Sequence, residues 1–136
     1  MLSRNHLSAV FFAFVSLSAA VDAEPTDKET EWVEAIFDYN AADDLANLTV
    51  CQKPELYGHY LQSLLGAGMA HPRTDPNKIA ALVRQIQRKA TSLADMRKGF
   101  NERTPPTPEE FESGCRFDVG QAVKHLEALD DFIFKS

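Results

Sequence analysis

Prolines placed at the starts of helically spaced apolar stripes restrict this chain to an α-helical fold. Pro54, Pro76 and Pro108 each open such a stripe, and proline suits the first helical position because no N–H is needed there. Asp75 is a good N-cap for the second of these stripes. The segment Thr107–Glu110 has the spacing of a capping box. No segment alternates strictly between apolar and polar residues as a half-buried strand would. The sequence therefore predicts an all-α fold.

Four helices are expected. The first begins near Thr26, and its signal fades through residues 40–47. The second ends before residues 71–72 and the third before residues 105–106, because prolines stop both. The fourth runs from residue 107, and its two glycines leave open whether it is continuous. Each expected helix has an apolar stripe that we expect to face the core. The first stripe comprises Trp32, Val33, Ile36 and Phe37, and the second comprises Leu56, Tyr57, Tyr60, Leu61, Leu64, Leu65 and Met69. The third comprises Ile79, Leu82, Val83, Ile86, Ala90, Leu93 and Phe100, and the fourth comprises Phe111, Cys115, Val119, Ala122, Leu126, Leu129 and Ile133.

The first 23 residues have the pattern of a cleavable signal peptide. Arg4 precedes an apolar run over residues 7–21, and Val21 and Ala23 supply small residues for a cut before Glu24. A membrane span needs about 20 apolar residues, so this run is short for a retained anchor. We expect residues 24–136 to form one periplasmic or secreted domain with no stable membrane span after cleavage.

Cys51 and Cys115 are the only two cysteines. In an oxidising compartment an even count predicts a disulfide, and two cysteines allow one intramolecular pairing. The bond would tie the start of the second helix to the start of the fourth. We therefore expect a small four-helix bundle with one disulfide.

The net charge is −6 and is unevenly distributed. Residues 24–48 hold eight acids and one base, whereas residues 78–103 hold seven bases and two acids. An acidic chain is a poor electrostatic match for nucleic acid. The charge blocks have two interpretations, which are complementary packing between neighbouring helices and a face that binds a partner.

Patterns for catalysis are not found in the sequence. It contains no G-x-S-x-G elbow, and oxidised cysteines offer no thiolate. Glu55 and His59 stand four apart on a helix face with Ser63, where we expect them to be solvent-exposed. The adjacent carboxylates Asp43–Asp44 and Asp130–Asp131 are also expected to be solvated. We therefore predict that the protein is not an enzyme and has no cofactor.

A haem- or metal-binding bundle is the alternative. The Pro-Pro turn followed by residues 107–129 resembles the soluble b-type cytochrome bundles, in which methionine and histidine ligate haem. The ligands that the chain offers for such a haem are Met69, Met96 and His125, and His125 with Met69 is the expected pair. The first helix lacks the methionine that those cytochromes use.

The main functional hypothesis is binding of another protein without catalysis, as an inhibitor, a toxin-immunity protein or a periplasmic chaperone. Small disulfide-tied helical chaperones and helical immunity proteins are similar in size and layout. Aromatic residues often anchor interfaces, so Trp32, Phe37 and Tyr39 are the candidate partner-binding residues. A homodimer is also compatible with the sequence. The Asn47-Leu48-Thr49 sequon leaves glycosylation open.

Overall fold

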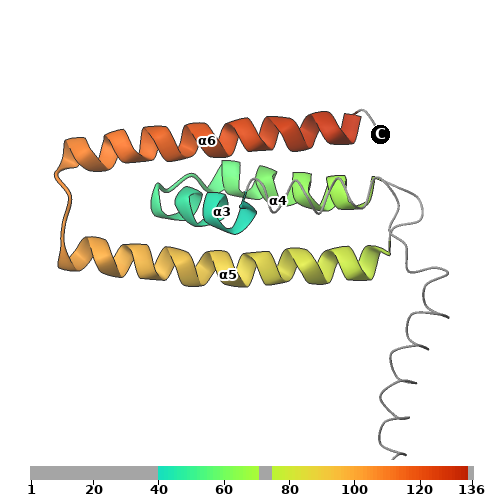
Figure 1. Ribbon diagram of the computed structural model, residues 1–136, viewed down its shortest axis with the longest axis horizontal. Helices are drawn as coiled ribbons and strands as arrows, with labels where there is room; N and C mark the ends of the chain where they lie inside the picture. The colour runs from blue at the N-terminus through green and yellow to red at the C-terminus, as the bar shows by residue number, and fades with distance from the viewer. Residues whose placement is uncertain (1–39, 71–74, 135–136) are drawn as a thin grey trace, which may run out of the picture.

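A computed structural model describes residues 40–70 and 75–134, which form four α-helices (Figure 1). They are α3 (Ala41–Val50), α4 (Pro54–Gly68), α5 (Pro76–Arg103) and α6 (Pro108–Phe134). This part of the chain contains no strand, as expected. The predicted signal peptide and residues 26–39 of the predicted first helix lie outside the described residues.

Three helix starts agree with the prediction. α4 and α5 begin at prolines, and the Asp75 side chain accepts a hydrogen bond from the Asn77 backbone N–H at 3.0 Å. At the start of α6 the capping box forms in both directions. The Thr107 hydroxyl accepts from the Glu110 N–H at 3.1 Å, and the Glu110 carboxylate accepts from the Thr107 N–H at 2.9 Å.

α6 is continuous through Gly114 and Gly120. A Cβ atom at either position would meet nothing within 4 Å, so neither glycine is required by close packing. Capping at one end and burial of the Ala122–Leu126–Leu129 face outweigh the lower helix propensity of these glycines.

The helix at 41–50 was not predicted, because the first apolar stripe fades in this region. α3 is short, and it is buried on most of its surface rather than on one stripe. Ala41, Ala42, Leu45, Ala46 and Leu48 are all buried. A helix of fewer than three turns offers few repeats of the periodicity on which such a prediction depends, and Asp43 and Asp44 interrupt the apolar residues of its first turn.

α3 and α4 lie between the two long helices (Figure 1). α5 and α6 pack mainly against α3 and α4 and scarcely against each other. The core gathers Leu45 and Leu48 of α3, Tyr60 and Leu64 of α4, and Leu129 of α6. A helix rises about 1.5 Å per residue, so α3 spans about 15 Å and α5 about 42 Å. The long helices consequently extend past α3 toward the 104–107 connection.

A Schellman motif ends α3 and positions the first cysteine. The Lys53 N–H donates to the Leu48 carbonyl at 2.8 Å, and the Gln52 N–H donates to the Thr49 carbonyl at 3.1 Å. Gln52 occupies the left-handed position of the motif with φ of 57°. Glycine is the usual residue there, because a side chain costs energy in this conformation.

The structure joins Cys51 to Cys115, with the sulfur atoms at 2.07 Å and the Cα atoms at 5.7 Å. The predicted pairing therefore agrees with the structure. Cys51 is the C-cap of α3, immediately before α4, and Cys115 lies in the second turn of α6.

Candidate functional site

Asp44 is a buried carboxylate at the centre of the bundle. Its side chain lies on α3, and the residue is only 4% exposed. The Tyr60 hydroxyl donates to Asp44 Oδ2 at 2.6 Å, and His125 Nδ1 lies 2.6 Å from the same oxygen. Burial raises the pKa of Asp44, and the hydrogen bonds from Tyr60 and His125 oppose that rise. The prediction that Asp44 is solvated is therefore wrong.

This cluster joins α3, α4 and α6 through one oxygen atom. A buried polar group needs such partners because an unsatisfied one costs about 1–3 kcal/mol. Sequence reasoning missed Asp44, although a carboxylate within the small, apolar run AADDLANL is the pattern that indicates it. We assign the cluster a role in fixing the three helices relative to one another.

The two proposed haem ligands lie on different helices. His125, on α6, pairs with Asp44, while Met69 is the C-cap of α4 and is 42% exposed. The prediction that Met69 belongs to the apolar core is therefore wrong. Residues 40–70 and 75–134 contain no group of three His, Cys, Asp or Glu side chains that could hold a metal ion. Haem ligation by His125 and Met69 stays a prediction.

A second polar cluster joins α4 to α6. His59 Nε2 lies 3.0 Å from Asp130 Oδ2, and the Ser63 hydroxyl donates to Asp130 Oδ1. Ser63 is buried, so the prediction of an exposed face at this position is wrong for Ser63 and correct for His59. Asp130 lies between the histidine and the serine. In a Ser-His-Asp triad the histidine lies between the serine and the aspartate, so that the imidazole contacts the hydroxyl. Here the aspartate is in the middle, and the cluster does not have the order of a triad.

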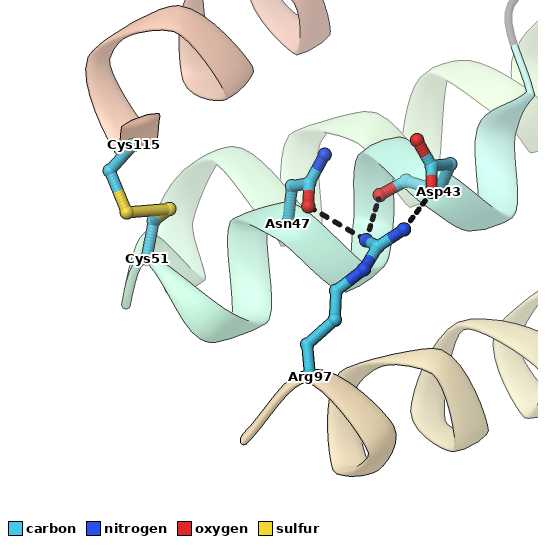
Figure 2. Close-up of a disulfide and its surroundings, with 5 residues drawn as sticks. All are labelled: Asp43, Asn47, Cys51, Arg97 and Cys115. Carbon is cyan, nitrogen blue, oxygen red and sulfur yellow. Dashed lines mark hydrogen bonds and ion pairs between the residues drawn. A yellow bond between two sulfur atoms is a disulfide. The ribbon is translucent and has the colours of Figure 1, made fainter. Parts of the chain in front are cut away.

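Arg97 connects α5 to α3 near the disulfide (Figure 2). Its guanidinium forms an ion pair with Asp43 and donates to Asn47 Oδ1 at 2.7 Å. This contact agrees with the interpretation that the acidic and basic blocks pack against each other. Arg97 falls on the buried stripe of α5, three residues after Ala94 and seven after Ala90, and a base on such a stripe is the sequence signal for a paired cation.

A cleft lies between α5 and α6 beside the disulfide, and we call it the hairpin cleft. Its volume is about 390 Å³. Its floor is one side of α3, from its first turn to its C-cap, and its walls are the last turns of α5 and the first turns of α6. The lining residues are Asp43, Asn47, Val50, Cys51, Arg97, Asn101, Pro106, Glu110, Phe111, Gly114, Cys115 and Asp118.

Asp118 is a cleft carboxylate whose pKa is raised by its surroundings. Burial raises its pKa, and the nearby Asp43 carboxylate raises it further, whereas the Arg97 guanidinium lowers it. Glu110 differs, because hydrogen bonds from the Thr107 backbone and hydroxyl lower its pKa. The cleft therefore combines a carboxylate that caps a helix with one that lies in a partly desolvated position.

Large apolar side chains are exposed on the last turns of α5 and the first turns of α6, and of these Phe111 lines the hairpin cleft. Met96 and Phe100 on α5 are 64% and 56% exposed, and Phe111 and Phe117 on α6 are 39% and 66% exposed. The prediction that Phe100 and Phe111 belong to the core is therefore wrong, because α3 ends before it can cover them. A groove of about 370 Å³ on α5, lined by Met96 and Phe100, shares Arg97 and Asn101 with the cleft.

The sequence-predicted partner residues Trp32, Phe37 and Tyr39 lie outside the described residues. Within residues 40–70 and 75–134, no helix combines the length and apolar character needed to cross a membrane. Comparison of the chain with protein-family models, curated proteins and solved structures finds no match.

Proposed function

We propose that this chain is an exported helical protein that binds another protein and catalyses no reaction. The observation that carries the proposal is the exposure of Met96, Phe100, Phe111 and Phe117 on the last turns of α5 and the first turns of α6, the turns that form the hairpin cleft. Several large apolar side chains exposed at one end of a small protein favour an interaction site there. Aromatic side chains beside a pocket are also the usual anchors of interfaces.

The disulfide supports export, because such bonds persist in oxidising compartments. An inhibitor, an immunity protein and a chaperone would all use a surface of this kind. The exposed side chains make the α5–α6 end of the bundle a candidate interface in addition to the aromatic segment 32–39, which stays a prediction.

Site-specific photo-cross-linking in the source cells tests the proposal. A photoreactive phenylalanine analogue replaces Phe100 or Phe117 in the full chain. Arg84, an exposed residue near the opposite end of α5, receives the same analogue as the control. We expect discrete adducts of one mass from Phe100 and Phe117 and none of that mass from Arg84. Identical adduct patterns at all three positions, or none at any, would contradict protein binding at this end.

Absorption spectroscopy of the purified protein tests the haem alternative separately. The proposal requires a protein without a Soret band and without stoichiometric metal. A Soret band lost in both His125→Ala and Met69→Ala, with each variant still helical, would establish the cofactor-binding alternative instead.

A further inference from the structure

The hairpin cleft has an excess of negative charge. Three carboxylates line it, those of Asp43, Glu110 and Asp118, against the single guanidinium of Arg97. That guanidinium is already engaged by Asp43 and Asn47. The remaining charge of the lining is therefore that of Glu110 and Asp118, and it favours a cation over an anion.

The cleft also has an apolar side. Phe111, Val50 and Pro106 contribute to its lining, and the Met96–Phe100 groove adjoins it through Arg97 and Asn101. A long basic side chain suits such a site, because its aliphatic stem packs on apolar surface while its charged head reaches polar groups. An aromatic ring adds a favourable contact with the cation itself.

The size of the cleft limits what it can hold. Pockets for small ligands measure about 300–1,000 Å³, and a volume of about 390 Å³ lies near the lower end. It can accommodate one or two side chains but is too small for a whole helix. The rest of the bound segment would then contact the adjoining groove and the exposed phenylalanines.

We propose that the hairpin cleft binds a cationic amphipathic segment of a partner protein. A Lys or Arg side chain of that segment enters the cleft beside Asp118 and Phe111, and its apolar neighbours cover Met96 and Phe100. The inference rests on the proposed function and specifies the chemistry of the partner. It depends on charge complementarity between the acidic lining and the basic segment.

Charge argues against residues 24–39 of this chain as the occupant. That segment holds six acids and one base, so it would bring further negative charge to an acidic site. A second copy could contribute the basic residues of its own α5, and the experiment includes this outcome.

Fluorescence anisotropy with a designed peptide tests the proposal. The probe is a labelled amphipathic peptide of leucine and lysine, titrated with the mature, disulfide-bonded chain. Two control peptides replace all lysines by glutamate or all leucines by serine. We expect binding of the leucine–lysine peptide and at least about tenfold weaker binding of both controls, because cation and apolar surface are both needed. Equal affinity for the glutamate peptide would overturn the proposal.

Two variants locate the binding. Asp118→Asn should weaken binding of the lysine peptide about tenfold, and Phe100→Ser should also weaken it. Phe100 is largely exposed, so its variant is expected to fold even if Asp118→Asn does not. Asp95→Asn removes the same charge from an exposed part of α5 outside the cleft and should change affinity less than twofold.

The outcomes separate this inference from the proposed function. Equal effects of Asp118→Asn and Asp95→Asn would show attraction by net charge alone and would overturn the cleft assignment. If cross-links from Phe100 and Phe117 form while the lysine peptide fails to bind, protein binding stands and the cationic partner is wrong. Self-association in sedimentation velocity, abolished by Asp118→Asn, would identify a second copy as the occupant and overturn a separate partner.

Discussion

At the residue scale, Asp44 makes stability depend on pH. Its pKa is raised in the folded protein because burial disfavours the charged form. The pKa of Asp44 is higher in the folded protein than in the unfolded chain, where it is about 3.9. The stability that this difference contributes is fully present below about pH 3.9 and is lost as the pH rises through the pKa of the folded state. We expect Asp44→Asn to remove this loss. The free energy of unfolding of Asp44→Asn minus that of wild type should therefore increase from about pH 4 toward neutrality.

Urea denaturation at several pH values measures this difference. Asp95→Asn, which removes an exposed carboxylate, is the control for loss of one negative charge. An identical pH dependence in both variants would contradict a special role for Asp44. Asn keeps an oxygen that can accept the hydrogen bond from Tyr60, so helix content should be retained.

Single residues also show where the sequence was informative about the site and where it was not. The disulfide could be predicted, because two cysteines have one possible pairing. The partners of Arg97 and Asp44 could not be predicted, because Asp43 and His125 lie 54 and 81 positions away from them in the chain. Periodicity identifies the face on which a residue lies but not which residue of another helix meets it.

At the element scale, glycines in the helices provide matched substitutions. A Cβ at Gly120 would meet nothing within 4 Å, whereas a Cβ at Gly66 would lie 2.9 Å from Ile133 Cδ1. Gly120→Ala should raise the free energy of unfolding by about 0.5–1 kcal/mol, since alanine is the better helix former. Gly66→Ala should gain less or lose stability, because the end of the Ile133 side chain must move.

Thermal and urea unfolding followed by circular dichroism compare these two variants. A neutral Gly120→Ala together with a stabilised Gly66→Ala would show that the packing at these two positions has been assigned incorrectly. Neither substitution touches the exposed aromatic side chains, so peptide binding should be unchanged in both.

The elements themselves were predictable where each has one apolar face and a marked start. α4, α5 and α6 meet both conditions, so their first residues agree with the sequence prediction. α3 meets neither. Its N-cap, Asn40, makes no side-chain hydrogen bond, and six of its ten residues are buried. The apolar stripes of α5 and α6 also include Phe100 and Phe111. No neighbouring helix covers these two positions, so both of these expected core residues are exposed.

At the scale of the whole molecule, the disulfide restricts the unfolded chain. It joins residues separated by 64 positions, for which the chain-entropy model gives about 4 kcal/mol. The Cys51→Ser, Cys115→Ser double variant should therefore melt well below wild type, at about 4–8 °C per kcal/mol for a domain of this size. Helix content at moderate temperature should persist. An unchanged melting temperature in the double variant and in reduced wild type would contradict this contribution.

α5 and α6 are each attached to α3 by a contact of a different kind, at its first turn and at its C-cap respectively. Cys115 holds α6 through a covalent bond, whereas Arg97 holds α5 through a partly exposed ion pair with Asp43. Dissolved salt screens the second contact and leaves the first intact. A reducing agent cleaves the first and leaves the second. The contacts at the two walls of the hairpin cleft therefore respond to different conditions, one to ionic strength and the other to redox potential.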